Sequence, residues 1–147
     1  EYHKGRMASV VYHAYNQILQ NGRLRLFRSH RPDYKDGEQK RDFIYVTDIL
    51  SVTDWLLLQQ APSGIYNLGT GAAATFLQLA QAVFHAMDKE VQIDFIDTPE
   101  DIRDTYQYFT EADMHKLIQA GYHLPFQNID HGVNDYVRNY LRMNRGY

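Results

Sequence analysis

The sequence predicts a mixed α/β fold with few strands. Apolar residues recur at helical spacing in several segments of the 147-residue chain, and short alternating or β-branched runs lie between them. These runs are too few for the long series of strand–helix units that a complete doubly wound sheet requires. The length is enough for one domain with its own core, or at most two small units.

Apolar spacing and turn residues predict the elements of the first half. In order, they are a helix over residues 6–21, a strand over 24–27, a loop over 28–40, a strand over 43–46 and a helix over 48–60. Gly22 is expected to end the first helix. The apolar face of that helix is formed by Met7, Val10, Val11, Ala14 and Ile18. The second helix is expected to direct Ile49, Val52 and Leu56 inward.

Apolar spacing and turn residues also predict the elements of the second half of the chain. The expected elements are a strand over residues 65–68, a helix after Thr75, a strand over 91–95, a helix from Thr110 to Gly121 and a helix from Ile129. Thr75 with Gln78, and Thr110 with Asp113, have the spacing of a capping box, and Phe109 with Met114 that of a hydrophobic staple. The residues expected to be buried on these helices are Phe76, Leu79, Ala80, Val83, Met87, Val133, Tyr136, Val137 and Tyr140.

Composition argues against several classes of function. The formal net charge is -3, so no global positive field attracts nucleic acid. The absence of cysteine excludes disulfides and thiolate metal sites, and it favours a cytoplasmic protein. No apolar run approaches the ~20 residues that cross a bilayer, and the scattered histidines form no metal-binding pair. We therefore expect no membrane, nucleic-acid or metal partner.

A glycine-rich turn matches a dinucleotide-binding pattern. The segment Gly69-x-Gly71-x-x-Ala74 follows a predicted strand, opens a helix and precedes Asp97 at roughly the distance of a ribose-binding carboxylate. Glycines in such a turn let a pyrophosphate approach the N-terminus of a helix. Any tight strand-to-helix turn also favours glycine, and neither flank supplies the other strands of a cofactor domain. Direct cofactor binding and a structural turn both remain open from these residues.

Basic residues are concentrated in one segment of the chain, as Arg23, Arg25, Arg28, His30, Arg31, Lys35, Lys40 and Arg41. Guanidinium groups bind diphosphates through two parallel hydrogen bonds, so this segment is compatible with an anion site. Interspersed carboxylates also allow a solvated loop. No tyrosine is followed four positions later by lysine, so the pair that dehydrogenase-like enzymes use for proton transfer is not found.

Two motifs resemble those of a known family. Residues 40–48, Lys-Arg-Asp-Phe-Ile-Tyr-Val-Thr-Asp, resemble the Arg-Asp-Phe-x-Tyr-Val-x-Asp signature of extended short-chain dehydrogenase/reductase sugar epimerases and dehydratases. Residues 64–71, Gly-Ile-Tyr-Asn-Leu-Gly-Thr-Gly, follow at the usual distance in that family. Within the family, residues 3–10, 106–113 and 120–126 are similar to the branch that epimerises an ADP-linked glycero-manno-heptose.

The resemblance implies that residues 1–147 form a C-terminal substrate-binding region, in which residues 42–88 are the last elements of a Rossmann domain. The half that carries the main NADP site and the Tyr-x-x-x-Lys pair is then expected to be absent from this chain, which alone should be inactive. The Gly69–Gly71 turn would belong to a late strand of the cofactor domain. The complete enzyme would be a cytoplasmic, homo-oligomeric isomerase that uses NADP and an ADP-sugar in lipopolysaccharide precursor synthesis.

The same resemblance implies roles for individual residues. Lys4 is expected to transfer a proton beside the cofactor and to contact NADP. The residues expected to bind the ADP-sugar are Arg6, His13, Phe27, Arg28, Ser29, His30, Arg41 and Tyr106. Arg41 is expected to hold the diphosphate, and helical spacing places Arg6 and His13 on one edge of the first helix. Arg6 and residues 28–30 depart from the family pattern, and the following loop is longer, so heptose specificity stays open.

Two alternatives remain. The chain could come from another nucleotide-sugar epimerase or dehydratase, one that acts on a UDP- or GDP-sugar. It could also be a binding module without catalytic ancestry, which should have a self-contained core. A chain separated from a partner domain should instead expose apolar residues, for which the candidates are Ile44, Val46, Leu56 and Leu57.

Overall fold

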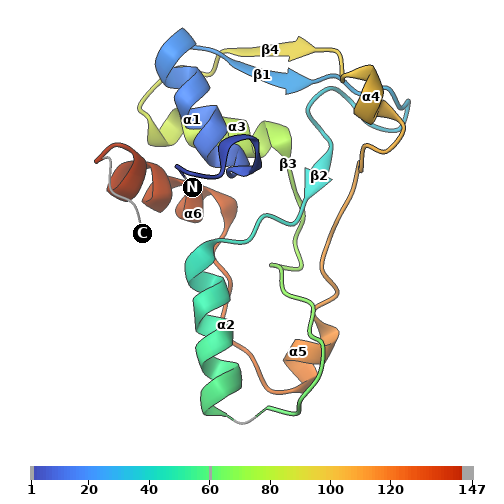
Figure 1. Ribbon diagram of the computed structural model, residues 1–147, viewed down its shortest axis with the longest axis vertical. Coiled ribbons are helices and arrows are strands. Elements are labelled where there is room, and N and C mark those ends of the chain that lie inside the picture. Colours follow the sequence, from blue (N-terminus) through green and yellow to red (C-terminus); the bar gives the residue numbers. More distant parts are fainter. Residues whose placement is uncertain (1, 60, 144–147) are drawn as a thin grey trace.

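The computed structural model describes residues 2–59 and 61–143, which form an α/β fold with two small sheets (Figure 1). In chain order, its elements are a 3₁₀ turn η1 (Gly5–Met7), α1 (Val10–Asn21), β1 (Leu24–Phe27), β2 (Lys40–Arg41), α2 (Val46–Leu58), β3 (Ala74–Thr75), α3 (Phe76–Ala86), β4 (Ile93–Ile96), α4 (Glu100–Arg103), α5 (His115–Gln119), α6 (Ile129–Asp135) and a π-helical turn η2 (Tyr136–Leu141). None of the helices within these described ranges is long and apolar enough to span a membrane.

The main core lies where α1, α3, α6 and η2 pack together beneath β1. Strands β1 and β4 pair in parallel, with Leu24 opposite Ile93 and Phe27 opposite Ile96. Figure 1 shows the helices gathered on one side of this two-stranded ribbon. The fully buried side chains of this core include Ile18, Leu79, Val83, Phe84 and Val137.

Local sequence explains why the two central helices start where they do. The Ser9 hydroxyl accepts a hydrogen bond from the Tyr12 N–H at 3.1 Å and caps α1. Gly22, at φ +68°, ends α1 in the left-handed conformation that glycine adopts most easily. Thr75 and Gln78 form the predicted capping box of α3, with both reciprocal hydrogen bonds present.

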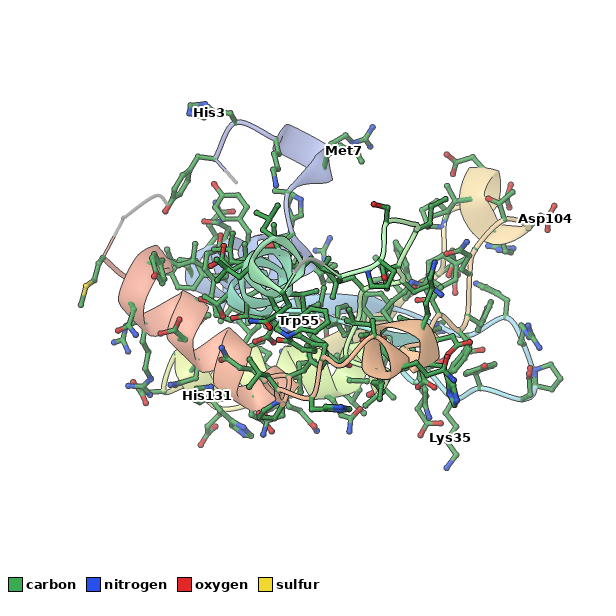
Figure 2. All side chains as sticks on the ribbon, turned by 90° about the horizontal axis from the view of Figure 1, so that it is seen from below. His3, Met7, Lys35, Trp55, Asp104 and His131 are labelled. Carbon is green, nitrogen blue, oxygen red and sulfur yellow. The ribbon has the colours of Figure 1, made fainter. Side chains whose placement is uncertain are left out.

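A second, smaller core lies between α2 and α5. Val52 and Leu117 are each 1% exposed, and Trp55 packs edge-on against Tyr122 at 5.5 Å between ring centroids. Trp55 is half-buried against this cluster, and Figure 2 marks its position. The chain therefore contains two hydrophobic clusters, and the segments that join them carry the short β2–β3 sheet.

Two predicted strands, over residues 43–46 and 65–68, are wrong. The structure gives residues 42–45 and 65–68 no regular secondary structure, and Val46 already begins α2. The apolar residues of these two segments pack against the cores without forming strands. Phe43 and Tyr45 contact the main core, and Leu68 contacts the second one. An apolar run becomes a strand only where a neighbouring strand accepts its hydrogen bonds, and no sequence pattern reveals that neighbour.

Three details of the predicted helices also need correction. Met7 lies in η1, outside α1, and its side chain is 84% exposed. Ile49 faces solvent, whereas Val52 is buried as expected, and Gln60 lies outside the described residues. The helix expected from Thr110 starts at His115, where the Asp113 carboxylate accepts the His115 N–H at 3.0 Å.

Other element predictions are confirmed. The strand over residues 24–27 is present, and the strand expected over 91–95 forms over 93–96. The last helix starts at Ile129, as predicted, and continues into η2. The residues found buried as expected are Leu79, Ala80, Val83, Met87, Val133, Tyr136 and Val137.

One face of α2 is apolar and exposed. Leu57 is 74% exposed and Leu50 57% exposed, and Val46 lies on the same helical stripe. Of the residues predicted to form an exposed apolar face, Val46 and Leu57 are exposed, whereas Ile44 and Leu56 are half-buried.

Candidate substrate-binding site

The side chain of Arg41 lies between two aromatic rings. β2 pairs with β3 so that Arg41 lies opposite Ala74, two residues before Phe76 at the start of α3. The guanidinium carbon is 5.8 Å from the centroid of the Phe76 ring and 5.7 Å from that of Tyr106. Stacking of this kind holds the planar guanidinium. Its Nη1 group donates a hydrogen bond to the Lys40 carbonyl at 2.8 Å, which leaves the other N–H groups for a ligand. Among the described residues, no carboxylate forms an ion pair with Arg41.

The next residue, Asp42, fixes the backbone around Arg41. Its carboxylate accepts hydrogen bonds from the Thr70 N–H and hydroxyl at 2.7 and 2.6 Å, and from the N–H groups of Gly71 and Ala112 at 3.0 Å each. Burial acts to raise the pKa of Asp42, but these hydrogen bonds outweigh it and hold the pKa below its usual range. Asp42 therefore joins three segments that are distant in sequence.

The Gly69–Gly71 turn does not form the dinucleotide site that its pattern suggested. The amide N–H groups of Thr70 and Gly71, which would have to face a pyrophosphate, instead donate to Asp42. A Cβ at Gly69 would clash with the Asp42 Oδ2 atom, so the glycine is required by close packing. No strand precedes the turn, and Asp97 follows a strand paired with β1. The geometry therefore supports a structural turn rather than a cofactor-binding loop.

The basic loop after β1 is held by several anchors. The buried Gln39 amide donates to the carbonyls of Phe27 and Arg28, at 3.3 Å each. The hydroxyl of Thr98, itself buried, donates to the same Arg28 carbonyl at 3.2 Å. Within the loop, the Ser29 N–H donates to Asp36 at 2.8 Å. These contacts order the start of the loop beside the end of β1.

A series of aromatic rings runs along one side of this loop. Tyr106 lies 6.0 Å from Phe27 and 5.5 Å from Tyr108, and Tyr108 lies 5.2 Å from Tyr34. The Tyr108 hydroxyl accepts the His30 N–H at 2.9 Å. Burial raises the pKa of Tyr106, although the positive charge of Arg41 opposes the shift. Tyr106 is therefore a neutral phenol at physiological pH and can donate a hydrogen bond.

Six of the eight residues predicted to bind substrate thus belong to one contact network, namely Phe27, Arg28, Ser29, His30, Arg41 and Tyr106. Sequence reasoning missed Gln39, Asp42, Phe76 and Tyr108, which hold these six in place. Asp42 could have been noticed because it adjoins Arg41 in the motif, and Tyr108 because it lies two residues after Tyr106. The contacts of Gln39 and Phe76 leave no local pattern in the sequence.

The other predicted residues, Lys4, Arg6 and His13, lie on the N-terminal segment. Arg6 belongs to η1, and the extended Ser9 separates it from α1, so Arg6 and His13 do not share a helix edge. All three side chains are exposed, and His13 packs against the Tyr12 ring at 6.0 Å. Figure 2 shows His3 and Met7, on the same segment, projecting from the body of the molecule. Within the described part of the chain, neither Arg6 nor His13 contacts Arg41 or the two rings beside it.

A stacked guanidinium, a neutral phenol and an ordered basic loop can bind an anionic ligand that also has an aromatic or sugar portion. Within the part of the chain that the structure describes, no group of three or more histidine or carboxylate side chains could hold a metal ion.

Comparison with known proteins identifies the family. Residues 1–69 match the model of the NAD dependent epimerase/dehydratase family. The ADP-L-glycero-D-manno-heptose-6-epimerase of Fusobacterium nucleatum is 46% identical over 100% of this chain, which spans 46% of that protein. A protein of the same name from Nitratidesulfovibrio vulgaris is 54% identical over 96% of the chain, which spans 44% of its length. The chain belongs to the NAD dependent epimerase/dehydratase family.

Solved structures of epimerases share the fold. A Helicobacter pylori ADP-L-glycero-D-manno-heptose-6-epimerase superposes with a TM-score of 0.74 at 22% identity, over 95% of this chain and 40% of that one. A UDP-N-acetylglucosamine 4-epimerase from Methanobrevibacter ruminantium gives a TM-score of 0.72 at 18% identity, over 93% and 40%. The predicted resemblance and fold class are confirmed. This chain of the epimerase/dehydratase family spans less than half of the length of these relatives.

Proposed function

We propose that this chain provides the nucleotide-sugar-binding part of an NADP-dependent epimerase that acts on an ADP-linked glycero-manno-heptose. The observation that carries the proposal is Arg41, whose guanidinium is stacked between Phe76 and Tyr106 and has no carboxylate partner among the described residues. The relatives at 46% and 54% identity, both named as ADP-heptose epimerases, support the choice of ADP-sugar.

The residues of this chain would bind and orient the substrate. Arg41 would donate two parallel hydrogen bonds to the diphosphate, and the neutral Tyr106 phenol would donate to a sugar or phosphate oxygen. Phe27 and the backbone of residues 28–30 would line the same ligand. Such positioning contributes to catalysis by holding the reacting carbon in a fixed place.

The turn at Gly69–Gly71 does not fit NADP, because Asp42 occupies its amide donors. NADP, which the family resemblance implies, would exchange the hydride in the complete enzyme. Lys4 is proposed to move a proton at the reacting carbon from its place just before η1. We expect this chain alone to show no turnover, and we propose that the complete enzyme is homo-oligomeric, is located in the cytoplasm and serves lipopolysaccharide precursor synthesis.

Calorimetric titration tests the binding role of Arg41. The chain is titrated with ADP-mannose, ADP-ribose, UDP-glucose and NADP, and the titration is repeated with the variant Arg41→Ala. Loss of a charge-assisted bidentate contact is expected to weaken ADP-mannose binding by about tenfold or more. Arg25→Ala, which removes the same charge from an exposed site on β1, is the matched control.

The pattern of ligands separates the alternatives. Preference for ADP-sugars that depends on Arg41 supports the proposal. A stronger affinity for UDP-glucose would instead indicate a UDP-sugar epimerase or dehydratase. Equal binding by the native chain and Arg41→Ala, or tight binding of NADP alone, would contradict the proposed site.

A further inference from the structure

Phe109 presents a free strand edge. In the bridge between Lys40 and Phe109, the Lys40 N–H donates to the Tyr108 carbonyl at 2.8 Å, and the Thr110 N–H donates to the Lys40 carbonyl at 3.3 Å. The N–H and C=O of Phe109 itself therefore point away from β2. Among the described residues neither of these groups makes a hydrogen bond. Figure 1 shows this segment, between α4 and α5, along the outer edge of the molecule beside β2 and β3.

Two open pockets meet at the Phe109 side chain, which is 51% exposed. One, of about 610 Å³, is lined by Lys40 and Thr75 on one face of the β2–β3 sheet, with Tyr34 and Glu38 from the loop above them. The other, of about 520 Å³, extends from Phe109 to Met114 and Ile118 at α5. A strand added along this edge would pass both pockets and could place a side chain in each.

The charge around this edge is mainly negative. Glu38, Glu111 and Asp113 line the two pockets, and the basic side chains that line them among the described residues are Lys40 and His115. Asp33 also lines the first pocket, but Arg31 pairs with it at 2.6 Å. The Glu38 carboxylate has no ion pair or hydrogen bond within the described part of the chain. Such a rim attracts a cationic partner.

We propose that the edge at residues 107–111 binds an extended basic segment of a partner protein, which adds a strand beside Phe109. Backbone hydrogen bonds to the Phe109 N–H and C=O would fix the alignment of the partner strand along this edge. Apolar side chains of the partner would enter the pockets, and its lysine or arginine residues would face Glu38 and Asp113. Addition of a strand to an exposed edge is a common mode of peptide recognition.

This surface is separate from the proposed substrate site. Lys40 and Arg41 are neighbours in β2 and therefore point to opposite faces of the small sheet. Lys40 lines the pocket beside Phe109, whereas Arg41 stacks on Phe76 and Tyr106. The proposal does not depend on which nucleotide-sugar the chain binds.

Calorimetric titration at low salt tests this proposal. The probe is an acetylated seven-residue peptide that alternates lysine and valine, compared with one that alternates glutamate and valine. Phe109→Pro removes a donor that has no partner inside the protein, and it is expected to weaken lysine–valine binding by about tenfold. Glu38→Gln is expected to weaken it by about threefold, because one attractive charge is lost. Glu90→Gln, at an exposed site elsewhere, is the control.

A second probe guards against misfolding of the proline variant. In this peptide every backbone nitrogen is methylated, so it cannot donate to the Phe109 carbonyl, and the native protein is used unchanged. Tight binding of the lysine–valine peptide, lost on methylation and on Phe109→Pro, supports the proposal. Equal binding of the methylated peptide or of the glutamate peptide, or no binding of the lysine peptide, would overturn it.

Discussion

Arg41 and Asp42 are adjacent in sequence and have different roles in the proposed site. Among the described residues, Arg41 presents between two rings a guanidinium that has no carboxylate partner and donates one hydrogen bond to the Lys40 carbonyl. Asp42 links the strand that carries Arg41 to residues 70, 71 and 112. Because a carboxylate that accepts several N–H hydrogen bonds is stabilised in its charged form, Asp42 links the stability of the site to pH.

Replacement of Asp42 by asparagine is expected to lower the free energy of unfolding by about 1–3 kcal/mol at pH 7, because an amide nitrogen would face N–H donors. The pKa of Asp42 is depressed in the folded protein. Its contribution is therefore present above the unfolded pKa, near 3.8, and is lost as the pH falls through the lower folded value. Urea denaturation of Asp42→Asn and the native chain should give free energies that converge below about pH 4.

Asp54→Asn is the matched control, because Asp54 is exposed on α2. A constant difference between Asp42→Asn and the native chain down to pH 2 would show that the carboxylate charge is not the cause. Equal stability of the two proteins at pH 7 would show that the hydrogen bonds of Asp42 are dispensable.

At the scale of elements, the start of α3 connects the site to the main core. Phe76 is the first residue of α3 and one of the two rings beside Arg41, while Leu79 and Val83 of the same helix are buried in the core. The capping box at Thr75 therefore fixes the position of Phe76, the first residue after β3. Weakening this cap should affect both the stability of the fold and the position of the ring.

Thr75→Ala is expected to lower the free energy of unfolding by about 1 kcal/mol, because the Gln78 N–H loses its hydroxyl acceptor. Thr75→Ser, which keeps the hydroxyl, should lose much less. Thermal unfolding followed by circular dichroism measures both. If the alanine and serine variants melt at the same temperature, the cap does not contribute as proposed.

The whole molecule leaves an apolar stripe of α2 exposed, formed by Val46, Leu50 and Leu57. Contiguous apolar surface of this kind favours association. The two separate hydrophobic clusters also mean that α2 contacts the rest of the chain mainly through the smaller one. The stripe therefore offers a surface for contact beyond the chain's own core.

Concentration-dependent self-association through this stripe is expected in sedimentation velocity. The double variant Leu50→Lys with Leu57→Lys should shift the chain towards monomer, because charged side chains would replace the apolar contact. Ser51→Lys with Gln59→Lys adds the same charge at exposed positions outside the stripe. An equal shift in both variants would assign the effect to net charge, and no shift in either would show that the stripe is not a contact.

Patterns that depend on neighbours within a few residues were predictable. The capping box at Thr75, the stop at Gly22 and the strand at residues 24–27 are present as expected, because each is decided by local hydrogen bonding or backbone conformation. The strands expected over residues 43–46 and 65–68 failed, because pairing depends on a distant partner. The motif around Arg41 and the Gly69–Gly71 turn identified the family.

The sequence by itself determined the α/β class and the helices of the main core, and it proposed a set of substrate-binding residues of which six share one contact network. Only the tertiary structure decided what each motif does. From sequence, the Gly69–Gly71 turn was compatible with pyrophosphate binding. In the folded chain, the amide groups of Thr70 and Gly71 donate to Asp42 instead. Helical spacing placed Arg6 and His13 on one edge of the same helix. In the structure Ser9 caps α1, so Arg6 lies before the helix and only His13 belongs to it. The physical reason is that a hydrogen-bond donor takes the acceptor that folding brings nearest, and that acceptor is often distant in sequence.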